Sequence, residues 1–141
     1  MTLSTTDRDL RQDVADVLVR YATSIDRKDW TRLRSCFTED CKADYGGIGV
    51  WDGVDAIAGY MTRTHPESIR SLHRITNVEV TREGEGVAAR SYVDVIFVVA
   101  ESGSGMHAVG TYDDELVRAE DGWKISRRRY TMVHMSPIRR S

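Results

Sequence analysis

The sequence lacks the residue patterns that mark membrane-spanning, secreted and metal-binding proteins. Its only two cysteines, Cys36 and Cys41, show neither CxxC spacing nor an accompanying pair of histidines. We therefore predict two reduced, partly buried thiols and no metal site or other cofactor. No apolar run is long enough to cross a bilayer, and the first residues, MTLSTTDRD, lack the basic and apolar segments of a signal peptide. The expected location is the cytoplasm, with no membrane partner.

An excess of charge of one sign is also missing. The chain has 20 Lys and Arg against 22 Asp and Glu, a formal net charge of -2, which gives no general attraction to nucleic acid. The glycine-rich stretch GGIGVWDG has no GK[ST] or GxGxxG continuation, so a flexible turn is a better interpretation than a phosphate-binding loop. With 141 residues and 40% hydrophobic content, we predict one globular domain over residues 1–137, followed by a tail of residues 138–141.

An amphipathic helix is the clearest element that is present. Apolar residues recur at helical spacing over residues 7 to about 27, namely Leu10, Val14, Val17, Leu18, Tyr21, Ala22 and Ile25. Asp26 lies close to the same face, which places a carboxylate at the edge of the core. A solvated Asp near a helix end is an equally good interpretation of this spacing alone. Thr5 or Thr6 is expected to cap the helix, and residues 1–6 to form a loose arm.

Shorter elements are predicted between this helix and residue 69. Asp29 is a suitable cap for a second helix that contains Trp30, Leu33 and Phe37. Residues 38–40 are expected to form a turn and residues 42–45 a brief strand. A third helix, built on Val54, Ile57, Ala58 and Met61, should end before His65, because the residue before a proline is disfavoured in the helical region.

From about residue 69 the pattern indicates strands. Four runs, residues 69–82, 86–100, 106–119 and 123–134, are separated by the hairpin-sized connections REGEG, ESGSG and AEDG. Helices followed by a long antiparallel meander predict an α+β domain, in which the helices pack on one face of a strongly curved, mostly antiparallel sheet.

Strand alternation predicts which polar side chains face the helices. In the last strand Trp123 and Ile125 should face inward, and a period of two carries Arg127 and Arg129 to that face. An inward arginine needs a ligand or a partner; the alternative is a side chain that reaches water at the open end of the strand. For Arg128 we favour ion pairs with residues 113–115 on the solvated face.

Among the histidines, His73 shares a face with Ile69 and Ile75 and is therefore expected to point toward the helices. A satisfied core histidine is the alternative to a catalytic one. The alternation around His107 does not assign its side, and His65 and His134 are interpreted as loop and tail residues.

These residues suggest a chemistry if the fold brings them together. An imidazole oriented by a buried carboxylate removes protons at neutral pH, which suits His73 and Asp26. Arg127 could stabilise a developing anion, with Tyr21 and Tyr45 as hydrogen-bond donors to the substrate.

Taken in order, four segments resemble the SnoaL-like branch of the nuclear-transport-factor-2-like superfamily: RYATSIDRKDW, FTEDCKADYGG, SLHRITNVEV and AVGTYDDELVRAEDGWKISRRR. Within it, the chain is most similar to the scytalone dehydratase and hexachlorocyclohexane dehydrochlorinase-like branch. The resemblance implies a cone-shaped α+β barrel and a homodimer, or a higher homo-oligomer, formed through the outer face of the sheet.

The resemblance also implies roles for individual residues. Asp26 in SIDRKDW matches the acidic member of the His/Asp pair of this branch, and His73 in SLHRITN matches the histidine base. Tyr45 matches a tyrosine that contacts substrate, and Arg127 an arginine that assists a departing anion. Ile25 and Phe97 stand where scytalone dehydratase has a tyrosine and a second histidine, so the identity of the substrate does not carry over.

The resulting hypothesis is a cofactor-independent lyase or isomerase that acts on a small hydrophobic molecule. The alternative is a non-catalytic module of the same fold that binds a ligand or assembles with a larger enzyme. Epoxide hydrolysis is a weaker hypothesis, because the Asp/Arg/Asp pattern that it uses is missing. For the homodimer, the Tyr92, Ile96 and Val98 side of the second long strand is the expected apolar patch, although Asp94 on that side could belong to a pocket instead.

Overall fold

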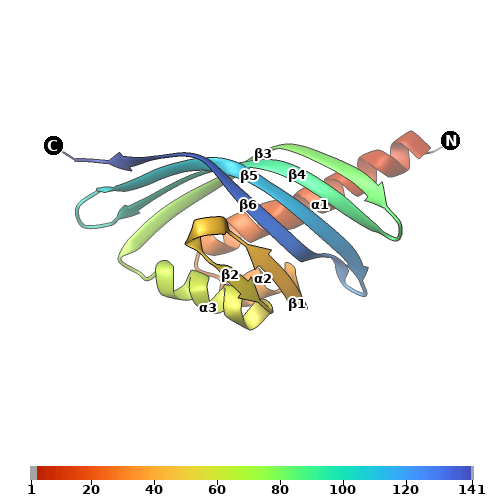
Figure 1. The fold of residues 1–141 in the computed structure, drawn as a ribbon, viewed down its shortest axis with the longest axis horizontal. Coiled ribbons are helices and arrows are strands. Elements are labelled where there is room, and N and C mark those ends of the chain that lie inside the picture. Colours follow the sequence, from red (N-terminus) through yellow and green to blue (C-terminus); the bar gives the residue numbers. More distant parts are fainter. Residues whose placement is uncertain (1–2, 141) are drawn as a thin grey trace.

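The helices precede the long strands along the chain, as the sequence predicted (Figure 1). The computed structural model describes residues 3–140, with side chains from residue 7 onward. The elements are α1 (Leu3–Asp26), α2 (Trp30–Arg34), β1 (Phe37–Asp44), the short 3₁₀ helix η1 (Gly46–Ile48), β2 (Val50–Asp52), α3 (Val54–Thr64), β3 (Ile69–Glu83), β4 (Gly86–Val99), β5 (Gly105–Ala119) and β6 (Gly122–Ile138).

One six-stranded sheet, in the order β2-β1-β6-β5-β4-β3, carries the fold. All neighbouring strands are antiparallel except β1 and β6, which are parallel. The sheet is curled, with α1 across one face of the long strands and α2, α3 and the β1–β2 pair grouped below them (Figure 1). The prediction of an α+β domain with a mostly antiparallel, strongly curved sheet is confirmed.

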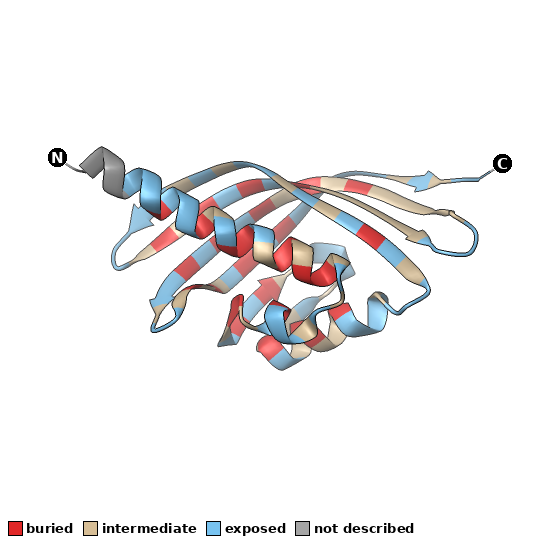
Figure 2. Ribbon diagram, turned by 180° about the vertical axis from the view of Figure 1, so that it is seen from behind, coloured by how far each residue is buried: buried red, intermediate tan, exposed pale blue. Residues whose placement is uncertain are grey.

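Helix α1 packs along β3 with the apolar face that the sequence predicted. The buried positions of the helix lie on the side that faces the sheet (Figure 2). The predicted loose arm is wrong for residues 3–6, because the helix already begins at Leu3 and includes Thr5 and Thr6. Extending a helix through such residues costs only tenths of a kcal/mol each, roughly. Residues 1 and 2 lie outside the described part of the chain.

A sharp reversal joins α1 to α2. Lys28 adopts a left-handed φ of 57°, and the Asp29 side chain accepts a hydrogen bond from the backbone N–H of Arg32 at 3.1 Å. The predicted cap at Asp29 is therefore confirmed. Phe37, however, belongs to β1 rather than to α2.

Strand β1 is longer than predicted, because residues 38–40 are strand and not a turn. Its pairing with the distant β6 outweighs the local turn preference of Thr-Glu-Asp. Cys36 and Cys41, at either end of this region, are fully buried and unbridged. Burial raises the pKa of the Cys41 thiol to about 11, so it is an unreactive packing group at neutral pH.

The four long strands occur where the sequence predicted them, with two irregularities that matter for the site. In β3 the pairing shifts between Thr76 and Glu79, where Asn77 has a φ of 53°. In β6 the pairing with β5 shifts between Ile125 and Arg127, which leaves Ser126 as an extra residue. Each bulge changes which residues beyond it face inward. Within residues 3–140, no helix is long and apolar enough to cross a membrane.

Candidate active site

A cavity of about 280 Å³ lies between the concave side of the sheet and helices α1 and α3. Fifteen residues line it, most of them apolar or aromatic: Tyr21, Tyr45, Ile48, Tyr60, Met61, His65, His73, Val93, Val95, Phe97, Ala108, Tyr112, Tyr130, Met132 and Met135. Larger hollows of about 660 and 560 Å³ lie over the other face; charged side chains line most of the first, and Glu79, Arg90 and Asp94 contribute to the second. An apolar hollow with a few converging polar groups is the better candidate for a small-molecule site.

Asp26 and His73 meet in the wall of this cavity. The His73 Nδ1 and Asp26 Oδ1 atoms are 2.7 Å apart, and the two side chains are only 8% and 13% exposed. Asp26 Oδ1 also accepts a hydrogen bond from the Ser71 hydroxyl at 2.9 Å, and its Oδ2 accepts one from the His73 backbone N–H at 2.9 Å. The predicted inward orientation of His73 is therefore confirmed, and Asp26 is in hydrogen-bond reach.

The same contacts fix the tautomer of His73. A carboxylate only accepts hydrogen bonds, so Nδ1 must carry the proton that it shares with Asp26. In the neutral ring the lone pair is then on Nε2, which has no partner among the described residues. This arrangement of a carboxylate, an oriented imidazole and a free Nε2 is suited to proton abstraction.

A buried ion pair lies beside the cavity. Arg128 and Asp114, both with fully buried side chains, form two hydrogen bonds of 2.7 and 2.9 Å. The guanidinium carbon is 3.6 Å from the ring centre of Tyr112 and 4.2 Å from that of Tyr21. Burial alone would lower the pKa of Arg128, but the Asp114 carboxylate together with Tyr45 and Tyr21 outweighs it, so the pKa lies well above the usual value. The guanidinium therefore stays charged.

Three tyrosine hydroxyls gather next to this guanidinium. The Tyr21 hydroxyl is 2.9 Å from that of Tyr45 and 3.3 Å from that of Tyr112, and Arg128 donates a hydrogen bond to Tyr45 at 3.4 Å. Burial raises the pKa of Tyr21 and of Tyr112 well above the usual value, so these hydroxyls stay protonated. They can donate hydrogen bonds to a group that becomes negative.

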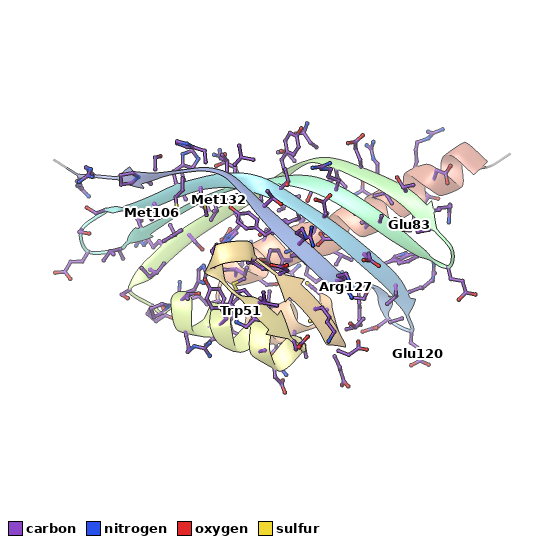
Figure 3. The ribbon with its side chains drawn as sticks, viewed as in Figure 1. Trp51, Glu83, Met106, Glu120, Arg127 and Met132 are labelled. Atoms are coloured by element: carbon purple, nitrogen blue, oxygen red, sulfur yellow. The ribbon has the colours of Figure 1, made fainter. Side chains whose placement is uncertain are left out.

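The predicted inward orientation of Arg127 and Arg129 is wrong. The extra residue in β6 reverses the alternation after Ile125, so Arg128 faces inward and both its neighbours face outward. Arg127 has a side chain that is 62% exposed and lies 3.6 Å from Glu115. Figure 3 shows Arg127 on the part of β6 nearer to Glu120, whereas Met132, which lines the cavity, lies further along the strand. The surface ion pair predicted for Arg128 is wrong for the same reason.

The structure also places the other histidines and Asp94. His107 is on the outer face of the sheet, where its Nε2 lies 2.6 Å from Asp94 Oδ1, and Asp94 also accepts a hydrogen bond from Arg74. Asp94 is therefore no part of the cavity. His65 lies outside the helix, as predicted, because it is the residue directly after α3, but it also lines the cavity. Among the described residues, no cluster of His, Cys, Asp and Glu is arranged to hold a metal ion.

The sequence predicted four of the residues found at the site, Asp26, His73, Tyr21 and Tyr45, but not the others. Ser71 could have been found, because it lies two residues before His73 in a strand and so shares its face. Tyr112 and Tyr130 carried no local signal that assigned their side.

The fold and the cavity define a class: a helix-covered, curled sheet that holds a His–Asp pair in an apolar hollow. The chain belongs to the SnoaL-like domain family, whose model matches residues 7–129. A candidate aromatic ring hydroxylase of Novosphingobium aromaticivorans is 30% identical, with a TM-score of 0.82 over 90% of this chain and 92% of the other.

Two further solved structures share the fold at lower identity. A candidate scytalone dehydratase of Novosphingobium aromaticivorans has a TM-score of 0.86 at 19% identity, over 95% of this chain and 91% of the other. The type 3 hexachlorocyclohexane dehydrochlorinase of Novosphingobium barchaimii has a TM-score of 0.82 at 18% identity, over 96% and 94%. The predicted resemblance to this branch is confirmed, and at these identities the likeness is one of fold.

Proposed function

We propose that the protein is a cofactor-independent lyase of the dehydratase type, or an isomerase, that acts on a small hydrophobic molecule by proton abstraction from carbon. The 2.7 Å contact between Asp26 and His73 in the wall of an apolar cavity carries this proposal. The fold that the chain shares with a dehydrochlorinase and a candidate scytalone dehydratase supports it.

His73 is the proposed base. Its Nε2 takes a proton from a substrate carbon, and Asp26 remains ionised and stabilises the imidazolium that forms. The backbone N–H of His73 and the Ser71 hydroxyl hold the carboxylate in place. A general base positioned in this way contributes about 10²- to 10⁴-fold to the rate.

The electron pair released from the carbon must be accommodated on an enolate oxygen or a leaving group. We assign this task to the hydroxyls of Tyr45, Tyr21 and Tyr112, which donate hydrogen bonds toward the developing charge. Arg128 does not line the cavity and acts through the hydroxyls. Its guanidinium lies against the rings of Tyr21 and Tyr112 and donates a hydrogen bond to the Tyr45 hydroxyl. It replaces Arg127 in the role that the sequence suggested.

The surroundings favour this chemistry and limit the substrate. Apolar side chains such as Val95, Phe97 and Met132 line the rest of the cavity, and low local polarity strengthens each remaining polar contact. A volume of about 280 Å³ is slightly below the range of small-molecule sites, which is roughly 300–1,000 Å³. A compact apolar substrate fits this size.

Hydrogen–deuterium exchange tests the proton abstraction before the substrate is known. Small ketones such as 1-indanone and 2-cyclohexenone are incubated with the protein in D₂O, and the loss of their acidic C–H signals is followed by NMR. We expect the wild type to accelerate exchange. His73→Ala and Asp26→Asn should each slow it by about 10²- to 10⁴-fold, since each removes the oriented base.

The matched control is His107→Ala. His107 also contacts an aspartate, at 2.6 Å, but it lies on the outer face of the sheet, so its loss should leave exchange unchanged. Full activity of either cavity variant would contradict the assignment. Ketones that bind to the wild type without exchange would instead support the non-catalytic binding module.

A further inference from the structure

The cavity holds a second imidazole, that of His65, beside the proposed base. The ring centres of His65 and His73 are 5.9 Å apart, and the indole of Trp30 lies 6.4 Å from His65. His65 directly follows α3 as its C-terminal cap residue, immediately before Pro66, and its backbone N–H donates to the Met61 carbonyl at 3.0 Å. The end of the helix therefore fixes where this ring lies.

The hydrogen bonds of His65 define its tautomer. Its Nδ1 is 3.0 Å from the carbonyl oxygen of Met61, which can only accept. Nδ1 is also 3.0 Å from the Thr64 hydroxyl, whose own proton can be donated to the Tyr60 carbonyl at 2.9 Å. Nδ1 must therefore be the protonated nitrogen, and Nε2 carries the lone pair. No described residue donates a hydrogen bond to that Nε2.

The surroundings keep this ring neutral. Burial, opposed by the bond to the Met61 carbonyl, lowers the pKa of His65 from its ordinary value, and His73 and Lys28 lower it further. Asp26 acts in the opposite direction but is already bound to His73. At neutral pH the cavity therefore presents the lone pair on Nε2 of His65 beside the imidazole of His73.

We propose that His65 determines specificity by accepting a hydrogen bond, through Nε2, from a hydroxyl group of the substrate. The proposal rests on the proposed function, in which the neighbouring His73 removes a proton from carbon. It narrows the substrate to an apolar molecule whose hydroxyl, whether phenolic, enolic or alcoholic, lies close to the C–H bond that breaks. The apolar walls alone would not distinguish such a molecule from its methyl ether, whereas a site that pairs with the hydroxyl does.

The test compares 2-naphthol with 2-methoxynaphthalene by isothermal titration calorimetry at pH 7.5. The ether carries a methyl group in place of the hydroxyl proton of the naphthol. Comparing the ratio of the two dissociation constants between protein variants cancels the effect of this methyl group. The wild type should bind the naphthol about 3- to 10-fold more tightly, the usual value of one buried hydrogen bond. Equal binding, or no binding of either probe up to millimolar concentration, would overturn the proposal.

Two substitutions separate the roles of the ring nitrogens. His65→Asn keeps an N–H near Nδ1 for the Met61 carbonyl but has no acceptor near Nε2, so the preference should disappear. His65→Gln extends an amide oxygen toward the Nε2 position and should retain part of it. An undiminished preference in His65→Asn would show that the hydroxyl is recognised elsewhere and would refute the proposal.

A direct readout comes from ¹⁵N NMR of the imidazoles, which are only four in this chain. We expect His65 to show the Nδ1–H tautomer and its Nε2 resonance to move when 2-naphthol is added. An Nε2–H tautomer, or no movement, would contradict the inference. His73→Ala should abolish ketone exchange but keep the naphthol preference, so a failure of the proposed function is distinguishable from a failure of this one.

Discussion

At the scale of single residues, the protein buries charge in two different ways. Asp26 is bound by three donors at the edge of a cavity, where a ligand can approach His73. Asp114 and Arg128 are joined by two hydrogen bonds, and both side chains are closed to solvent. In the proposed function the first pair exchanges a proton with a ligand, whereas in the second the guanidinium is fixed against the rings of Tyr21 and Tyr112.

Removing one member of the closed pair should be costly. Arg128→Met would leave the Asp114 carboxylate buried without a partner, and we expect a loss of about 3–5 kcal/mol in the free energy of unfolding, measured by urea denaturation. Arg127→Met is the matched control on the same strand. The exposed Arg127 side chain lies 3.6 Å from Glu115, and its loss should lower the free energy of unfolding by about 1 kcal/mol or less. Adding Asp114→Asn to Arg128→Met should restore part of the loss. Equal effects of the two single substitutions would contradict the structure.

At the scale of elements, the helices and long strands could be predicted from periodicity, whereas the bulges could not. The alternation correctly predicted that Trp123 and Ile125 face inward. Because Ser126 is an extra residue, however, Arg128 and not Arg127 faces inward beyond it. A bulge is set by the pairing partner, here β5, and nothing in the β6 sequence itself signals it. The same holds for residues 38–40, whose strand conformation depends on the distant β6. His65 was missed because the proline after it correctly predicted the end of a helix but not which way the last side chain points.

The joint between α1 and α2 holds the end of the helix that carries Asp26, and its cap can be tested. Asp29→Ala removes the side chain that accepts from Arg32 N and should cost about 1 kcal/mol of stability in chemical denaturation. Asp29→Asn keeps an acceptor oxygen, so it should lose less than half of this. Equal losses for the two variants would show that the hydrogen bond is not what Asp29 contributes.

At the scale of the whole molecule, the curled sheet separates a concave face with the cavity from an outer face that none of the helices within residues 3–140 covers (Figure 1). The outer face carries exposed apolar side chains, with Leu72 66% and Tyr92 51% exposed, beside the Arg74–Asp94–His107 cluster. Tyr92, Ile96 and Val98 share this face, as the homodimer hypothesis requires. The predicted homodimer is thus a testable consequence of the shape.

Light scattering coupled to size exclusion should give twice the chain mass of 16.0 kDa. Tyr92→Glu should shift this mass toward the monomer, because it places a charge within the apolar contact. Val19→Glu is the control, since Val19 is equally exposed at 51% but lies on α1. A wild-type monomer, or a Tyr92→Glu protein that stays dimeric, would refute this interface.

The order of the strands has a consequence for synthesis in the cell. Strand β6, the last strand that the structure describes, is not at an edge of the sheet but between β1 and β5, and it supplies Tyr130, Met132 and Met135 to the cavity. While the chain is still on the ribosome, β1 and β2 therefore have no strand that connects them to the β3–β5 meander. The proposed base and its carboxylate can already be paired, since β3 follows α1, but the chamber around them is completed only when the final strand emerges. The apolar lining that the earlier elements contribute is therefore expected to stay exposed to chaperones until β6 pairs with β1 and β5.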